Sequence, residues 1–208
     1  GERMRITPVL KEEANKKIYQ IFVDGVYSFS ITEEDYLKYN LYEKDELSED
    51  EINNIKRSVD FRCAKEAALN YISYKFRTEK EVKTKLQNEN FSDDVISDVL
   101  ADLKADGYIN DGLYVSKYLN EKRKLNPKSK RILILELKKK GIPLELILNG
   151  LDELEFDNIL VAEELVRKKF PDIQYSGKSN EKKIYKYLQY KGFSNEEIKT
   201  VLKKLFLS

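Results

Sequence analysis

The chain has no histidine, one cysteine and few turn-forming residues, and each scarcity narrows the functions open to it. Its 208 residues include 0 His, 1 Cys, 4 Pro and 8 Gly. Without histidine the usual general base of hydrolytic triads and the commonest zinc ligand are missing, and one cysteine cannot form a thiolate set. No segment matches a glycine-rich phosphate loop. We therefore predict that the protein is not an enzyme and needs no metal or cofactor.

The low proline and glycine content argues against a turn-rich all-β protein of this length. Charged residues make up 36% of the chain and consist largely of Lys and Glu, which favour helices. No apolar run approaches the roughly 20 residues that span a bilayer, and no signal peptide is evident. Cys63 stands beside Ala64 and near Ala68, as a small buried residue would. We expect a mainly helical cytoplasmic protein without membrane contact.

The N-terminal segment differs from the rest because it favours strands. Residues 18–31 place two β-rich runs on either side of Asp24 and Gly25, the pair that suits a type I′ turn. Residues 5–10 form another β-rich run. The sequence therefore predicts a β-hairpin or a small three-stranded sheet, which must pack on a helical neighbour to be stable.

Helix-start signals follow this segment. Thr32 is expected to open a short helix that ends near Tyr39. Ser48 and Glu51 have the spacing of a capping box, in which each side chain binds a backbone N–H left unpaired by the first helical turn. A long helix is predicted from this box to about Tyr74.

The remainder of the chain repeats with a period of 51 residues. The segments 85–103, 136–154 and 187–205 align without a gap. Their apolar columns are Val82/Leu133/Ile184, Leu86/Leu137/Leu188, Phe91/Ile142/Phe193, Ile96/Ile147/Ile198, Leu100/Leu151/Leu202 and Leu103/Leu154/Leu205. A looser match extends to Ala64/Val115/Val166 and Ala68/Leu119/Phe170. Such periodicity is typical of a tandem helical array.

Each repeat contains a position where one helix stops and the next begins. The stop residues are Asn90, Gly141 and Gly192, which tolerate the left-handed conformation. The restart residues are Ser92, Pro143 and Ser194, which suit helix N-termini. The predicted helices are 58–75, 79–89 and 93–106, then 111–125, 129–140 and 143–152, then 157–170, 180–191 and 195–206.

A unit of this size buries too little apolar surface to be comfortably stable alone, so neighbouring units should stack. We predict an elongated, curved array of three three-helix repeats that offers a long face, not a pocket. The predicted domains are 1–47 for the strands and short helix, and 48–107, 108–155 and 156–208 for the three repeats. A monomer meets these requirements.

Charge is segregated although its total is balanced. Residues 32–60 hold ten acids and four bases, whereas residues 111–141 hold ten bases and three acids. Residues 167–204 hold eleven bases and four acids. The repeats share a basic column, Lys80/Arg131/Lys182, which we expect on the solvent side of each second helix. This strip could contact nucleic-acid phosphates or an acidic protein, and the alternative is an ordinary solvated surface.

The 14 tyrosines allow two interpretations as well. Several flank the basic segments, namely Tyr71, Tyr74, Tyr114, Tyr118, Tyr185, Tyr187 and Tyr190. Packing between helices with a solvated hydroxyl is the simpler explanation, and stacking on nucleic-acid bases is the alternative.

Three blocks in this array resemble the RecX family of bacterial recombinase regulators. They are ALNYISYKFRTEKEVKTKL at 68–86, GYINDGLYVSKYL at 107–119 and KRILILELKKKGI at 130–142. The resemblance covers about residues 60–206. Departures are Lys75-Phe76, where the family usually has Arg-Pro, and Asn90, where it has Gly.

The resemblance implies that the protein binds the RecA recombinase filament on single-stranded DNA and limits ATP hydrolysis and strand exchange in recombination and DNA repair. The candidate partner contacts are Lys75, Arg77, Lys80, Arg123, Lys130, Arg131, Lys138 and Lys140. Arg77, Lys80, Arg131 and Lys140 match family motif positions, and the others rest on charge. We expect reversal of Arg131 and Lys140 to Glu to abolish inhibition without unfolding the protein.

Two other functions remain open from sequence. The protein could bind DNA on its own through the basic strip; beside the recombinase, we expect a weak DNA contact through this strip. It could also be a helical-repeat scaffold for an unrelated acidic protein. Strong binding to bare DNA that falls steeply with salt would favour the first of these.

Overall fold

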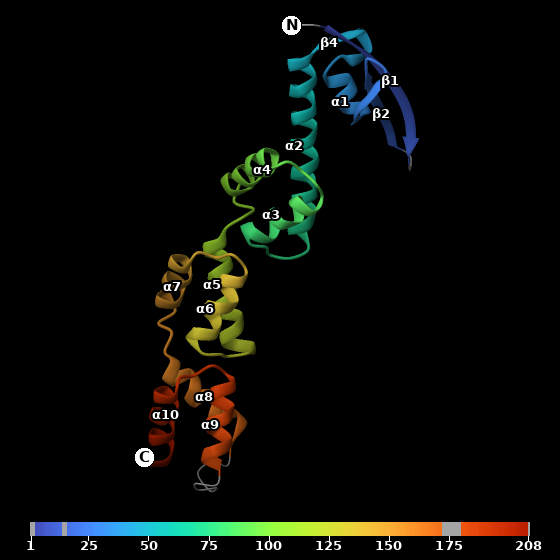
Figure 1. Cartoon of the computed structure of the whole chain (residues 1–208). Helices are drawn as coiled ribbons and strands as arrows, with labels where there is room; N and C mark the ends of the chain where they lie inside the picture. Colours follow the sequence, from blue (N-terminus) through green and yellow to red (C-terminus); the bar gives the residue numbers. More distant parts are fainter. Residues whose placement is uncertain (1–2, 14–15, 172–179, 208) are drawn as a thin grey trace. The chain divides into compact units, whose positions relative to one another are not determined.

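The computed structural model describes residues 3–13, 16–171 and 180–207. The chain divides into two compact units (Figure 1). The first unit contains residues 1–74 and 83–106, and the second contains residues 75–82 and 107–208. Among the described residues, no helix combines the length and the apolar character that crossing a bilayer requires.

The first unit begins with a four-stranded antiparallel sheet of order β3-β2-β1-β4. Its strands are β1 (Arg3–Glu13), β2 (Lys16–Val23), β3 (Val26–Thr32) and β4 (Glu46–Ser48). Asp24 and Gly25 join β2 to β3 with φ values of 49° and 81°, which confirms the predicted turn. The fourth strand was not predicted, because its three residues are too few to show an alternating pattern.

Three helical segments follow the sheet: α1 (Glu33–Lys38), the 3₁₀ helix η1 (Leu41–Glu43) and the 25-residue α2 (Glu49–Ser73). The predicted capping box at α2 is present. The Glu51 N–H donates to Ser48 Oγ at 3.2 Å, and the Ser48 N–H donates to a Glu51 carboxylate oxygen at 2.9 Å. The helix therefore begins where the two side chains bind its unpaired N–H groups.

The sheet packs on α2 through a continuous apolar core. Its fully buried members include Ile21, Ile31 and Leu47 from the strands. Cys63 lies partly buried against this core and carries a free thiol. Asp35 is 4% exposed and accepts a 2.6 Å hydrogen bond from the Arg62 guanidinium, so a buried carboxylate is paired.

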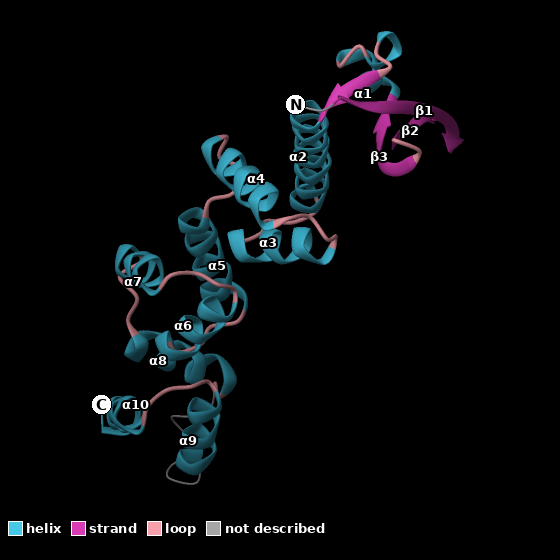
Figure 2. Ribbon diagram, turned by 45° about the horizontal axis from the view of Figure 1, so that its top comes forward, coloured by secondary structure: helices cyan, strands magenta, loops and turns pink. Residues whose placement is uncertain are grey.

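The remaining helices complete three three-helix repeats (Figure 2). The first repeat consists of α2 with α3 (Glu79–Asn88) and α4 (Asp93–Ala105). The second contains α5 (Asp111–Leu125), α6 (Lys130–Lys139) and α7 (Leu144–Glu153). The third contains α8 (Asn158–Lys169), α9 (Glu181–Tyr190) and α10 (Asn195–Leu207). The predicted repeat architecture is confirmed, whereas the four-part domain division stays a prediction.

The repeated columns point inward. Leu86, Leu137 and Leu188 are each fully buried, and so are most of their companions in the other columns. The second and third repeats each have their own apolar cluster. Helices α5, α6 and α7 form the cluster of the second repeat, and α8, α9 and α10 form that of the third. Residues 51 positions apart therefore occupy equivalent places in the cores of successive repeats.

Each stop position closes its helix with the same hydrogen bonds. Asn90, Gly141 and Gly192 have φ values of 63°, 87° and 90°. The following N–H groups, of Phe91, Ile142 and Phe193, donate to the carbonyls of Leu86, Leu137 and Leu188 at 3.3, 3.2 and 3.1 Å. This is the Schellman arrangement, which requires a left-handed residue, so the predicted stops are confirmed.

Candidate interaction surface of the second unit

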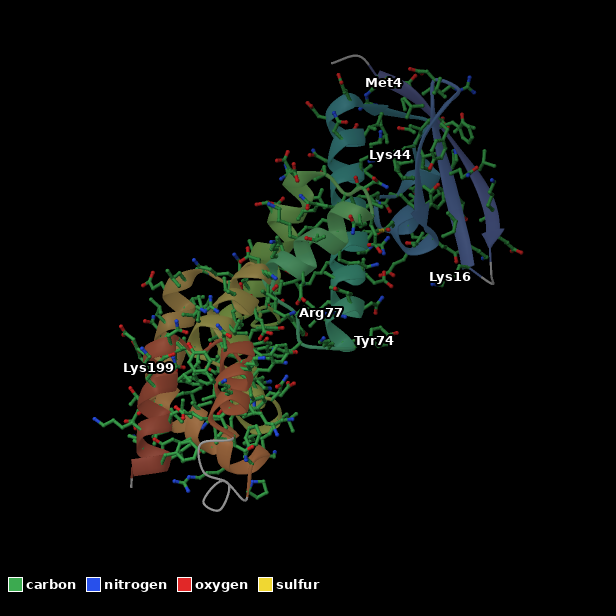
Figure 3. All side chains as sticks on the ribbon, turned by 60° about the horizontal axis from the view of Figure 1, so that its bottom comes forward. Met4, Lys16, Lys44, Tyr74, Arg77 and Lys199 are labelled. Atoms are coloured by element: carbon green, nitrogen blue, oxygen red, sulfur yellow. The ribbon has the colours of Figure 1, made fainter. Side chains whose placement is uncertain are left out.

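All eight candidate contact residues lie in the second unit, in segments 75–82 and 107–208. Lys75, Lys80, Arg123, Arg131 and Lys138 are exposed. Arg77, Lys130 and Lys140 are partly buried; Arg77 stands in the segment between α2 and α3 (Figure 3). Arg77, Lys130 and Lys140 also interact with other residues of the chain. These three side chains therefore contribute to the fold, whether or not they also contact a partner.

The start of α3 packs on the turn between α6 and α7, and we call this contact the first junction. The Thr78 hydroxyl donates to the Lys140 carbonyl at 2.8 Å. The Glu79 N–H donates to the Asp111 carboxylate at 2.9 Å. The Lys140 ammonium pairs with the Glu81 carboxylate at 2.9 Å. The turn that ends α6 is thus also a docking point for α3.

The start of α6 packs in the same way on the turn between α9 and α10, which forms the second junction. The buried Ser129 hydroxyl donates to the Gly192 carbonyl at 2.8 Å. The Lys130 N–H donates to the side-chain oxygen of Asn158 at 2.8 Å. Arg131 Nε also reaches the Gly192 carbonyl, at 3.4 Å. Thr78 and Ser129 stand 51 residues apart, so the two junctions are repeats of one arrangement.

At the stop positions 141 and 192, both the positive φ and the close packing of the neighbouring helix require glycine. A Cβ at Gly141 would lie 2.4 Å from Lys80 Cδ, and a Cβ at Gly192 would lie 2.2 Å from Ile132 Cγ1. The predicted basic column is exposed, but its Lys80 side chain also lies along the neighbouring turn. No residue larger than glycine fits without displacing these neighbours.

Lysines lie over aromatic rings along the second unit. Phe76, Tyr114 and Tyr118 form a ladder with successive ring centroids 6.3 and 6.2 Å apart. The ammonium groups of Lys117, Lys140 and Lys122 lie 4.0, 5.5 and 5.1 Å from the Phe76, Tyr114 and Tyr118 centroids. Lys169 and Lys191 lie 5.4 and 5.9 Å from the Tyr187 centroid. We call these residues the lysine-aromatic face.

The sequence gives Lys140 as a candidate contact and Tyr114, Tyr118 and Tyr187 as tyrosines near basic segments, but it does not predict that lysines lie over these rings. Cation–π pairs form at such distances and favour an ordered ammonium group. A signal for them was present, since Tyr118 and Lys122, like Tyr187 and Lys191, are four residues apart on one helix. Charge and motif position select other basic residues, because neither criterion takes account of helical spacing to tyrosine.

Hydrogen bonds fix the middle of this face. The Tyr118 hydroxyl donates to Glu136 at 2.7 Å, and the same carboxylate pairs with Lys128. Burial and the Glu136 carboxylate both raise the pKa of Tyr118. Burial opposes ionisation of Glu136, but Lys128 and Tyr118 outweigh it and lower the pKa of that carboxyl. Tyr114 and Tyr118 therefore serve packing, as the simpler interpretation predicted, whereas Tyr190 is 84% exposed.

Two family models match the repeats. A model described as the first three-helix domain of RecX matches residues 64–103. A model described as the third three-helix domain of RecX matches residues 161–202. The first range begins in α2 and ends in α4, and the second begins in α8 and ends in α10, so they correspond to the first and third repeats.

Proteins described as regulatory protein RecX match over nearly the whole chain. A regulatory protein RecX of Streptococcus pneumoniae is 33% identical over 94% of this chain and 75% of its own length. One from Bacillus licheniformis is 31% identical over 96% of this chain and 76% of its own length. The crystal structure of RecX from Lactobacillus salivarius has a TM-score of 0.63 and 32% identity, covering 72% of this chain and 98% of that one.

A further crystal structure, of a regulatory protein RecX, agrees in fold. Its TM-score is 0.66, and the match covers 96% of this chain and 99% of that chain. Its sequence identity is 24%, so it supports the arrangement of helices and strands alone.

Proposed function

Because this chain belongs to the RecX family, as its 31–33% identity to curated members over most of its length shows, we propose that it binds a RecA recombinase. In this proposal it is a non-enzymatic regulator of the filament that RecA forms on single-stranded DNA. Binding lowers ATP hydrolysis and DNA strand exchange in recombination and repair. The protein would act in the cytoplasm as a monomer.

The observation that carries the proposal is the family relationship, and the charge of the second unit supports it. Exposed cationic side chains stand on α5 and α6, including Arg123 and Lys138. Neither has an ion pair in the described part of the chain. Such groups suit carboxylates of a protein surface or phosphates of bound DNA.

Reversal of Arg131 and Lys140 is not a clean test of this surface. Lys140 pairs with Glu81, so a glutamate at 140 would face another carboxylate in a partly buried junction. Arg131 donates to the Gly192 carbonyl. Loss of inhibition in that double variant could come from a disturbed fold, contrary to our expectation from sequence.

Arg123→Glu with Lys138→Glu is the sharper variant, because both side chains are exposed. RecA-dependent ATP hydrolysis on single-stranded DNA is measured while the wild-type protein is added up to equimolar amounts. We expect inhibition by the wild type, and roughly tenfold more of the variant for the same effect, which corresponds to about 1.4 kcal/mol of binding free energy.

Lys199→Glu is the matched control, since Lys199 is exposed on α10, outside the eight candidates (Figure 3). It should inhibit like the wild type. An ATP hydrolysis rate that does not respond to the wild-type protein contradicts the recombinase proposal. Tight binding to bare DNA that falls steeply with salt, without any effect on RecA, would favour the stand-alone DNA-binding alternative.

A further inference from the structure

In both junctions a capping hydroxyl donates to a carbonyl of the neighbouring turn, but the junctions differ in the charge of their side chains. Lys140 in the first junction corresponds to Lys191 in the second, 51 residues later. Glu81 in the first corresponds to Ile132 in the second. The second junction therefore keeps the lysine and replaces its carboxylate partner with an apolar side chain.

In the first junction the lysine is neutralised within the chain. The Lys140 ammonium and the Glu81 carboxylate are 2.9 Å apart, and both side chains are largely buried. Burial works against the charge of Lys140, but Glu81 and the Tyr114 hydroxyl outweigh it and raise the pKa of that ammonium. The pair is therefore charged and mutually satisfied.

In the second junction the equivalent lysine has no carboxylate partner among the described residues. Lys191 donates to the side-chain oxygen of Asn126 at 2.9 Å. Burial, followed by the nearby charges of Lys128 and Lys169, lowers the pKa of the Lys191 ammonium. Lys128, which lines the same region, is itself paired with Glu136.

A cavity of about 240 Å³ opens at this lysine. Its lining comes from the end of α5, the start of α6 and the end of α9: Asn126, Lys128, Ile132, Tyr190 and Lys191. Ile132 and the Tyr190 ring give it apolar walls, and Tyr190 is 84% exposed, so it is accessible to another molecule. One ammonium group without a carboxylate therefore stands in a small, partly apolar cavity.

We infer that this cavity receives an acidic side chain, aspartate or glutamate, from the protein partner. The inferred carboxylate would take the place that Glu81 occupies at Lys140, and its methylene stem would lie against Ile132 and Tyr190. This inference rests on the proposed function for the identity of the partner, the recombinase. The apolar walls and the example of Glu81 favour a carboxylate over a backbone phosphate of DNA.

Two variants test the inference from opposite directions. Ile132→Glu gives Lys191 an internal carboxylate and so copies the first junction. Lys191→Gln removes the ammonium group. Each should raise the protein concentration that half-inhibits RecA-dependent ATP hydrolysis by roughly tenfold, the effect expected when one charge-assisted contact is lost.

Ile132→Gln is the matched control, because it is close to Ile132→Glu in size and polarity but carries no charge. It should inhibit within about a factor of three of the wild type, which corresponds to less than 0.7 kcal/mol. Thermal unfolding followed by circular dichroism establishes that each variant is folded. If Ile132→Glu unfolds at a lower temperature than the wild type, Lys191→Gln becomes the deciding variant. It removes the ammonium group without breaking an ion pair within the described chain.

The outcomes separate the inference from the proposed function. If the wild type leaves ATP hydrolysis unchanged, the proposed function fails and the assignment of the partner fails with it. If the wild type inhibits and both variants inhibit equally well, the cavity assignment alone is overturned. If the variants inhibit normally but lose affinity for a fluorescent single-stranded oligonucleotide without RecA, the ligand is a phosphate and the carboxylate assignment is overturned.

Discussion

At the scale of single residues, the stop glycines have two separate reasons to be glycine. Gly192 has a φ of 90°, and a Cβ there would lie 2.2 Å from Ile132 and 2.7 Å from Ser129 Oγ. Gly107 has a φ of 77° but no atom within 4 Å of the same position. The two sites therefore separate backbone strain from steric contact.

Gly192→Ala should lower the free energy of unfolding by about 2–4 kcal/mol, the sum of left-handed strain and overpacking. Gly107→Ala should cost about 1–2 kcal/mol, since only the strain applies. Urea unfolding followed by circular dichroism measures both. Equal losses in the two variants would mean that the junction yields to the added methyl group, contrary to this explanation.

At the scale of helices, a capping residue can serve one helix or join two. Ser92 caps α4 by accepting from the Val95 N–H and is itself exposed. Ser129 caps α6 by accepting from the Ile132 N–H and also donates to the Gly192 carbonyl, while fully buried. Removal of the second hydroxyl therefore affects a helix start and a junction together.

Ser92→Ala should cost about 0.5–2 kcal/mol, as an exposed N-cap does. Ser129→Ala should cost about 2–4 kcal/mol, because a buried carbonyl also loses a donor. Ser129→Thr should retain most of the stability, since the Thr78 hydroxyl makes a comparable contact with the neighbouring turn in the first junction, at the Lys140 carbonyl. Denaturant unfolding of the three variants checks this order, and a mild Ser129→Ala would show that Arg131 alone satisfies the carbonyl.

The helices were predictable from sequence because their signals are local. The apolar columns, the left-handed stops and a residue suited to a helix N-terminus (Ser92, Pro143 or Ser194) recur in each repeat, so one pattern could be checked against two others. Strand β4 was not predictable, since its pairing of Arg3 with Ser48 depends on residues distant in the chain.

The candidate site was less predictable, because whether a lysine is paired or available to a partner depends on residues from other repeats. Lys140 and Lys191 occupy the same column, and only the structure shows one beside Glu81 and the other beside Ile132. Family motifs selected Lys140 and passed over Lys191. Charge counts describe a surface, but they do not say which charges are already paired within it.

At the scale of the whole molecule, the absence of histidine determines how stability should depend on pH. Histidine is the side chain that ordinarily titrates between about pH 5 and 8, and this chain has 0 His. The pKa values of Glu51, Glu81 and Glu136 are below 4.5, and that of Lys140 is above 10.5.

The folded protein should therefore keep a constant midpoint of thermal unfolding from about pH 5.5 to 8 and lose stability in acid. In the unfolded chain the three carboxyls return to ordinary pKa values near 4.5 and bind protons before the folded state does. Their contribution is complete above that value and is lost as the pH falls through the folded-state pKa values. Glu81→Gln should be less stable at neutral pH and less sensitive to acid, because it lacks one of these groups. Calorimetry from pH 3 to 8 measures both effects, and a transition between pH 6 and 7 would contradict the explanation.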